Sequence, residues 1–528
     1  MYRLGDHTYV EPLVNSWMAW WLTVAPVPAS LNVHSYQVPL LKAYLQSPVF
    51  HAKSEREPKL IGGSFVGIPP ERANEVRSLL QKTVAEQEKR LRMAEALEEF
   101  QSFLMAEAKG QSLEPLYEKI PAPLKGLVEL VYDYSNRPSV QILEGLTYRS
   151  EYYMPQLQSL RLARLQTDVD RRTFFSTPRL LSEGQIDWPV QFVDERARQL
   201  FALDREPRPL GYIRELLGPS VRSDEELLPL LSDAPLPSAP RWMESKVRVR
   251  YLGHATVLIE WKGISVLVDP VISVRPSAGG MERLSYADLP EKIDYVLITH
   301  AHGDHFYLES LLRLRHRIQH LVVPRSRGVL FGDVSLKLMA QALGFKSVLD
   351  PDIFESIPLP DGEIVIAPFL GEHGDLGHAK SAFVVRAGQE KILFAADSTC
   401  LDENVYRYVR ENLGELTTAF MNSETEGSPL TFTIEALFPK KRDRKLEKNR
   451  RCRGSNAAEG LRLLEVIGAR RVYSYAMGLE PWLEHVIGPA SAPESVRMQD
   501  SDHLIAEART RGLVAERLCG PREFFIEA

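Results

Sequence analysis

The sequence predicts an α/β protein in which a separate N-terminal α+β domain precedes an αββα sandwich with metal ions at one edge. Three observations favour this architecture. The chain has 528 residues, which is too many for one hydrophobic core. Residues 233–240, DAPLPSAP, contain prolines that interrupt regular structure and are interpreted as a linker. Alternating strands begin just afterwards, at Val247, so we expect domains at residues 1–240 and 246–528.

The N-terminal domain carries no recognisable catalytic motif. After the Pro-Pro pair at residues 69–70, apolar residues at helical spacing predict one long amphipathic helix that ends near Gly110; they are Val76, Leu80, Val84, Leu91, Ala94, Leu97, Phe100 and Leu104. We expect this stripe to face a core or an interface, not a cofactor. Trp17, Trp20 and Trp21 are interpreted as packing anchors, either in the N-terminal core or at a subunit interface.

A cluster of histidines follows the apolar strand predicted at residues 294–298. The run His300-Ala301-His302-Gly303-Asp304-His305 places three imidazoles and a carboxylate within six residues. His300 and His302 lie two apart and can project toward one ion, while Asp304 and His305 turn toward a neighbouring ion. Gly303, which lies between His302 and Asp304, permits the tight backbone that this arrangement requires. The pattern therefore predicts a dinuclear metal site at a strand end.

Further segments resemble the metallo-β-lactamase fold. Residues 251–259, followed by residues 266–270, resemble the opening hairpin of that superfamily. Downstream, the predicted strand at residues 391–396 ends at Asp397, where the superfamily carries a bridging aspartate. The resemblance covers residues 246–480 and implies an αββα sandwich. One helix is expected to start near Leu308, and a final helix near residues 501–511 is expected to cover a sheet face.

Two departures from the superfamily pattern bear on the chemistry. The strand at residues 363–370 runs into Gly371-Glu372-His373, where a zinc hydrolase supplies a histidine. Either Glu372 or His373 takes this position, because adjacent residues on an extended backbone point to opposite sides. The strand at residues 471–476 should end at the last histidine ligand and reaches Met477 instead, so that ligand is predicted to be missing.

A carboxylate in place of an imidazole, together with an open position, suits iron better than zinc. Oxygen donors stabilise higher oxidation states, and vacant positions admit dioxygen. With the chain length, the two-part layout and Glu372, the sequence resembles the diiron β-hydroxylase family of chloramphenicol biosynthesis. The resemblance implies an oxygen-dependent diiron monooxygenase that hydroxylates the β-carbon of an aryl amino acid on a peptidyl carrier protein, in nonribosomal peptide antibiotic biosynthesis. It also implies two iron ions, O2 as co-substrate, an external electron-donating reductase and a homodimer.

The resemblance assigns the iron ligands, which are His300, His302, Asp304, His305, Glu372 and Asp397. Glu424 follows the next strand and is a candidate mobile carboxylate near the cluster, so Glu372 and Glu424 are the candidate catalytic residues. An exposed loop glutamate is the alternative interpretation of Glu424. The alternative function is a zinc-dependent hydrolase of an ester, lactone or phosphodiester, with His373 as a ligand. Both functions occur on this fold.

Composition limits the partners and the compartment. The net charge of −6 argues against a general role with nucleic acid. Residues 440–453, KKRDRKLEKNRRCR, form a basic run that is interpreted as a solvated loop, a lid, or a docking surface for an acidic carrier protein. The three cysteines form no C-x-x-C pair, which favours a reducing cytoplasm. The apolar stretch at residues 17–28 is too short to span a bilayer and lacks a basic start, so no membrane association is expected.

Overall fold

The computed structural model describes residues 1–57, 60, 63–168, 172–236, 239–326, 333–371, 379–429, 434–437 and 451–526. Its C-terminal part contains two seven-stranded sheets. The first has the order β14-β13-β12-β11-β10-β9-β24, with β9 (Val247–Gly253), β10 (Thr256–Trp261), β11 (Ile264–Val268), β12 (Ile293–Leu297), β13 (Ile318–Val322), β14 (Val348–Leu349) and β24 (Arg522–Ile526). The second has the order β15-β16-β17-β18-β19-β22-β23, with β15 (Ser356–Leu359), β16 (Gly362–Ala367), β17 (Ala382–Ala387), β18 (Glu390–Ala396), β19 (Thr418–Met421), β22 (Arg471–Ser474) and β23 (Val514–Arg517).

The two sheets enclose one apolar core. Along β9, Val247 and Val249 point into this core, as side chains that alternate along a strand should. Phe394 and Phe420 enter it from the second sheet and stack with their ring centroids 5.0 Å apart. Because β-branched and aromatic residues fit a pleated buried surface, these segments form strands.

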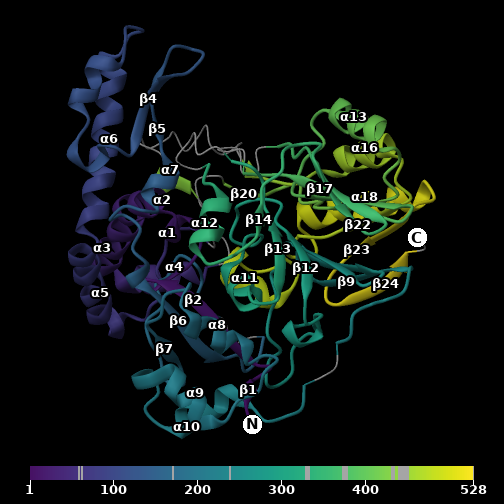
Figure 1. The fold of residues 1–528 in the computed structure, drawn as a ribbon, viewed down its shortest axis with the longest axis horizontal. Coiled ribbons are helices and arrows are strands. Elements are labelled where there is room, and N and C mark those ends of the chain that lie inside the picture. Colours follow the sequence, from purple (N-terminus) through teal and green to yellow (C-terminus); the bar gives the residue numbers. More distant parts are fainter. Residues whose placement is uncertain are drawn as a thin grey trace.

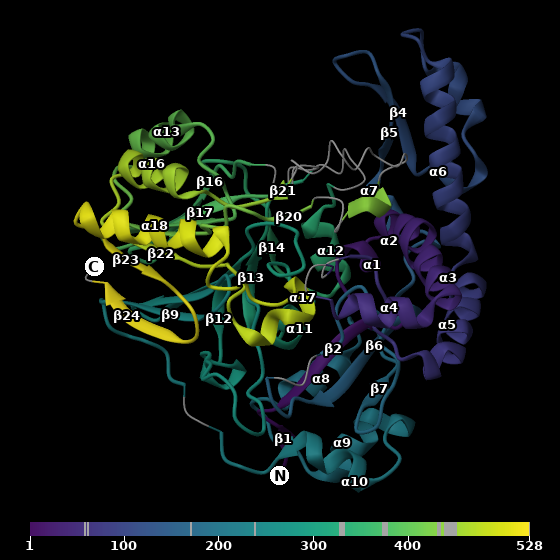
Figure 2. The ribbon, with the colours of Figure 1, turned by 180° about the vertical axis from the view of Figure 1, so that it is seen from behind.

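Helices cover the outer faces of both sheets (Figures 1 and 2). The second sheet packs against α13 (Glu403–Leu413), α16 (Ala457–Ile467) and α18 (Val496–Thr510) through a core of their own. The first sheet packs against α11 (Leu308–Leu314) and α12 (Leu336–Ala342). The predicted αββα sandwich is therefore confirmed, and so is the helix expected at Leu308. The final helix is also present but begins at Val496, five residues earlier than predicted.

The N-terminal part combines helices with strands, as predicted. Its four-stranded sheet has the order β3-β2-β6-β7, with β2 (Thr8–Val14), β3 (Trp17–Met18), β6 (Gln158–Arg164) and β7 (Ile186–Trp188). Smaller pairs join β1 (Arg3–Leu4) to β8 (Leu231–Ser232), and β4 (Val128–Tyr132) to β5 (Pro138–Ile142). The helices are α1 (Trp21–Val24), α2 (Pro26–Asn32), α3 (Val38–Gln46), α4 (Pro48–Glu55), α5 (Ala73–Glu86), α6 (Glu88–Glu107), α7 (Glu144–Thr147), α8 (Glu195–Ala202), α9 (Leu210–Leu217) and α10 (Asp224–Leu227).

The single long helix predicted after residues 69–70 is wrong, because the segment forms two helices, α5 and α6. They separate at Gln87, whose backbone is not helical (φ −113°, ψ 22°). Gln87 is buried and accepts a hydrogen bond of 2.9 Å from the buried guanidinium of Arg90. Within α5 the buried stripe is Val76, Leu79 and Thr83, while Val84 is 40% exposed. The spacing of apolar residues alone cannot predict an interruption of the helix that polar side chains stabilise.

The three tryptophans pack within one chain. Trp17 and Trp21 are each 3% exposed, so they are core residues and supply no surface for a subunit interface. Trp20 is half-buried and lies edge-on to Phe175, with ring centroids 5.9 Å apart. The interpretation as core anchors is confirmed for Trp17 and Trp21, and the interpretation as interface residues is wrong for both.

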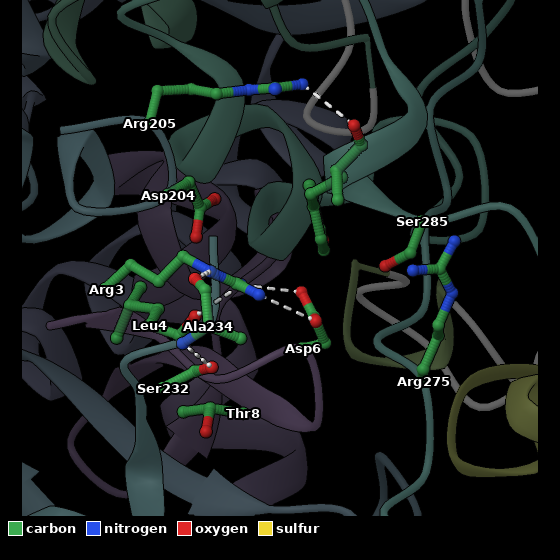
Figure 3. Close-up of polar contacts among 12 residues, drawn as sticks. Arg3, Leu4, Asp6, Thr8, Asp204, Arg205, Ser232, Ala234, Arg275 and Ser285 are labelled. Carbon is green, nitrogen blue, oxygen red and sulfur yellow. Dashed lines mark hydrogen bonds and ion pairs between the residues drawn. The ribbon is translucent and has the colours of Figure 1, made fainter. Parts of the chain in front are cut away.

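The N-terminal part is bonded closely to the first sheet and its helices. The Arg313 guanidinium on α11 donates to both carboxylate oxygens of buried Asp204, each at 2.7 Å. Figure 3 shows the neighbouring Arg3, which pairs with Asp6 inside the N-terminal part. Across the boundary, the Arg205 guanidinium donates to the carbonyl of Leu289 (2.6 Å). The apolar core is shared as well, because residues of both parts form one cluster. No helix in the described part of the chain is long and apolar enough to cross a membrane.

Candidate metal centre

Polar residues follow four strands at one edge of the sandwich. In the first sheet, Asp269 follows β11 and the histidine cluster follows the parallel neighbour β12. In the second sheet, Asp397 follows β18 and Asn422 follows the parallel neighbour β19. Parallel strands end at a common edge, where ligand sites form. The two edges meet, since His300 Nε2 lies 3.5 Å from Asp397 Oδ2.

Two groups of potential metal ligands result. Ligand atoms of His300, His305 and Asp397 lie within 4.8 Å of one another, and so do those of His254, Asp304 and His305. His305 belongs to both groups, so two ions held here would be neighbours. The structure therefore brings together four of the six predicted ligands, which are His300, Asp304, His305 and Asp397.

The remaining predicted site residues have different surroundings. His302 lies on the more exposed side of the loop, with its ring centroid 4.7 Å from that of His300. Glu424 is half-buried, and its carboxylate forms an ion pair with Arg497 of α18. It is therefore not an exposed loop glutamate, and its approach to the metals stays a prediction. Glu372 and His373 lie outside the described residues, so the choice between them also stays a prediction.

A buried carboxylate behind the cluster fixes the orientation of His305. Asp269 Oδ1 accepts from the Thr299 amide (2.8 Å), while Oδ2 accepts from the Thr299 hydroxyl (2.6 Å) and from His305 Nδ1 (2.8 Å). Because Nδ1 carries the proton, Nε2 presents its lone pair, and it lies 3.2 Å from Asp397 Oδ2. This buried Nε2 has no hydrogen bond within the described residues. A lone pair facing a carboxylate is repulsive unless a proton or a metal ion lies between them, so the residues fit a metal ion.

The charges of the site lead to the same conclusion. Burial alone would lower the pKa of His305, but the carboxylates of Asp397, Asp269 and Asp304 raise it well above its usual value. Burial would raise the pKa of Asp304, but the neighbouring His305 and His254 lower it below its usual range. The buried carboxylates give the site a negative potential that favours a bound cation, and an iron or zinc ion would neutralise this charge.

Three polar residues of the site were missed as site residues by sequence reasoning. His254 lies in the turn between β9 and β10 with φ +51°, and its Nε2 is 3.2 Å from Asp304 Oδ2. Asn422 donates from Nδ2 to Asp397 Oδ1 (2.7 Å) and to the carbonyl of Ala476 (2.9 Å). Asp269 supports His305 as described above. Each directly follows a largely buried strand, and that signal could have identified them.

Met477 stands where the last histidine ligand of the superfamily was expected. It is 4% exposed, and its sulfur accepts hydrogen bonds from the hydroxyls of Ser423 (3.3 Å), Ser474 (3.3 Å) and Ser501 (3.5 Å). These contacts hold the thioether in a pocket of hydroxyls. The side chain therefore serves the packing between β22 and α18.

Fold and site together define a metallo-β-lactamase-fold protein with a dinuclear metal centre. Residues 248–349 match the β-lactamase superfamily domain, and residues 3–235 match the diiron non-heme β-hydroxylase N-terminal domain. The 4-amino-L-phenylalanyl-(CmlP-peptidyl-carrier-protein) 3-hydroxylase of Streptomyces venezuelae is 32% identical over 541 residues, which cover 98% of each chain. The crystal structure of CmlA, a diiron β-hydroxylase from Streptomyces venezuelae, superimposes with a TM-score of 0.92 at 31% identity over 99% of each chain. The chain belongs to the diiron β-hydroxylase family.

Membership confirms the predicted family, fold and reaction class. The protein is a diiron monooxygenase that uses two iron ions and dioxygen. The hydrolase alternative has much less support. A metal-dependent hydrolase of Methanopyrus kandleri is 28% identical over 161 residues, but these cover only 29% of this chain and 62% of that protein. A match of 161 residues is too short to span both parts of the chain, whereas the hydroxylase match covers 98% of it.

Proposed function

We propose that this enzyme hydroxylates the β-carbon of an aryl amino acid held as a thioester on a peptidyl carrier protein, in nonribosomal peptide antibiotic biosynthesis. One observation carries the proposal. The Streptomyces hydroxylase whose name states a carrier-bound aminophenylalanyl substrate matches this chain over 98% of both lengths. One oxygen atom of O2 enters the C–H bond, and the other leaves as water with two electrons and two protons from an external reductase.

The experiment uses iron-loaded enzyme, a chemical reductant and a carrier protein loaded with L-phenylalanine. We expect the tethered aminoacyl group to gain one oxygen atom, and ¹⁸O2 should label it. Mass spectrometry of the loaded carrier measures both results. Hydrolysis of the thioester without oxygen incorporation, or equal turnover of free and tethered amino acid, would contradict the proposal.

Six residues would hold the metals. They are His300, His302, Asp304, His305, Glu372 and Asp397. When bound, the iron ions supply the activation of dioxygen and the oxidation of the C–H bond. The chain contributes the orientation of the ligands, through the hydrogen bonds that Asp269 accepts and that Asn422 donates. Glu372 and Glu424 are the proposed catalytic carboxylates, and Arg497 would hold Glu424 in place.

An acidic carrier protein and a reductase are the proposed partners. The basic run at residues 440–453 would attract the carrier; residues 440–450 lie outside the described part of the chain, and Arg453 pairs with Glu459 at 2.7 Å. Cys400 and Cys519 are free thiols, which supports a cytoplasmic location. We assign catalysis to residues 246–528.

A homodimer formed by residues 1–240 is the proposed assembly. The buried Trp17 and Trp21 cannot supply its interface, but α6 and the β4–β5 hairpin project from the body of the molecule (Figures 1 and 2). This projection carries exposed apolar side chains, namely Met105 (48%), Tyr117 (43%) and Tyr134 (113%). Sedimentation that shows only monomer at micromolar concentration would contradict the dimer.

A further inference from the structure

An aromatic pair from the N-terminal domain lies beside the metal-binding loop. A Cβ atom placed on Gly303 would lie 3.7 Å from Cε3 of Trp20, so the indole is in van der Waals range of the loop. Gly303 stands between His302 and Asp304, two of the proposed iron ligands. Trp20 in turn lies edge-on to Phe175, with centroids 5.9 Å apart and an interplanar angle of 63°. Both aromatic side chains are only half-buried, as is the loop from Ala301 to Asp304.

We infer that Trp20 and Phe175 form an aromatic subsite that binds the aryl side chain of the substrate. The inference rests on the proposed function, and it adds the residues that select the side chain. In an aryl amino acid the ring is bonded directly to the β-carbon. The ring must therefore lie beside the metal ligands when the β-carbon is in position to react. Trp20 occupies such a place, and aromatic rings favour edge-to-face and offset contacts with one another.

The loop that carries Phe175 is anchored by buried charges. Arg179 is 2% exposed; its guanidinium donates to Glu11 (3.0 Å) and to the carbonyl of Phe174 (2.9 Å). On the other side of Phe175, Arg172 donates to buried Glu309 of α11 (3.2 Å), four residues beyond His305. Two ion pairs thus fix this loop to the N-terminal sheet and to the helix that follows the metal loop. An aromatic wall held this firmly loses little conformational entropy when a ligand binds.

Phe175 also connects the pair to the opposite border of the site. It packs against an apolar cluster that includes Tyr307, Leu483 and Val486. Leu483 and Val486 belong to the segment that follows Met477, where the superfamily carries its last ligand. The aromatic pair therefore extends from Gly303 to this segment. By contrast, Phe369 near His300 is 6% exposed and is covered by the Lys380 ammonium 5.6 Å from its ring, so it offers little free surface.

The test compares two side chains of similar size, of which only one is aromatic. Iron-loaded enzyme is titrated, without dioxygen, with a carrier protein loaded with L-phenylalanine or with L-cyclohexylalanine, and the dissociation constants are measured by fluorescence anisotropy of the labelled carrier. We expect the wild-type enzyme to prefer the phenylalanyl carrier by roughly three- to ten-fold, the size of an aromatic pair contact. Trp20→Leu should remove this preference, and Phe175→Leu should reduce it.

Trp242→Leu is the matched control. Trp242 is also a half-buried tryptophan. Its carbonyl accepts a hydrogen bond from the Gly263 amide (2.8 Å), just before β11 begins, whereas Asp269 of the metal site follows the other end of β11. This variant should keep the wild-type preference. An unchanged preference in both Trp20→Leu and Phe175→Leu, or no preference in the wild type, would overturn the subsite alone. If neither loaded carrier binds the wild type, the proposed function is overturned and the subsite with it.

Discussion

Asp269→Asn should weaken metal binding without removing any direct ligand. The substitution keeps the shape of the side chain, and Oδ1 can still accept from the Thr299 amide. The atom in the place of Oδ2 becomes an amide NH2, which cannot accept the proton on His305 Nδ1. The imidazole must then move its proton to Nε2, which occupies the lone pair that faces Asp397. Loss of such a supporting contact lowers metal affinity about 10- to 100-fold, which corresponds to about 1.4–2.7 kcal/mol.

The assay is competition for iron with a chelator, followed by metal analysis, together with thermal unfolding of the metal-free protein. Asp288→Asn is a suitable control, since the half-buried Asp288 carboxylate, like that of Asp269, has fixed partners. They are the Ser285 amide (2.7 Å) and Arg275, in the loop between β11 and β12. This control variant should retain wild-type iron affinity. If Asp269→Asn also binds iron as tightly as the wild type, the argument that Asp269 fixes the His305 proton is refuted.

Three further predictions follow from the site and from the contact between domains. As-isolated protein should contain about two irons per chain by metal analysis; stoichiometric zinc with activity restored by zinc alone would contradict this. Glu372→Ala should cripple one iron site whereas His373→Ala should retain most metal, and the reverse pattern would return the centre to a hydrolase type. Arg313→Met should destabilise the protein by about 3–5 kcal/mol in calorimetry, because it leaves the buried Asp204 carboxylate unpaired, and adding Asp204→Leu should recover most of the loss.

Local patterns in the sequence predicted the sandwich and much of the metal site. Strands such as β12 and β18 are short apolar runs, and the polar residues at their ends are the ones that must meet at a sheet edge. His300, His305 and Asp397 could therefore be assigned from spacing and resemblance, and the structure brings them within 4.8 Å. Contacts that form only where the chain reverses direction in a turn could not be predicted from these local patterns. The pattern of residues 251–259 predicts one continuous run through His254, whereas a turn with φ +51° directs this residue toward Asp304.

Contacts between distant parts of the chain account for the other differences. Apolar periodicity predicted one helix across Gln87, because an arginine such as Arg90 is normally expected at the surface. In the structure Arg90 is buried, and its guanidinium donates to the Gln87 side chain and to the carbonyl of Tyr152. The tryptophan cluster gave no indication of which members were buried. Trp21 fills the core while its neighbour Trp20 remains half-exposed beside Gly303, and only the packing of the N-terminal domain on the metal loop distinguishes them.

The basic run at residues 440–453 provides the last prediction, which concerns recognition of the carrier. Carrier proteins are acidic, and long-range attraction to a positive segment would speed their encounter. Replacing Lys440, Arg442, Arg444 and Lys445 with Glu should slow turnover of tethered substrate and flatten its salt dependence, because such attraction is screened beyond about 8 Å at physiological ionic strength.

A control is needed because the same substitutions also make the whole protein more negative. Reversing four exposed basic residues elsewhere, Lys82, Lys89, Arg92 and Arg222, changes the net charge equally but should leave turnover and its salt dependence near wild type. Iron content should be unchanged in both variants, since neither set includes a proposed ligand. Equal slowing by the two sets would show that only net charge matters, and unchanged turnover in the first set would remove the case for docking at this run.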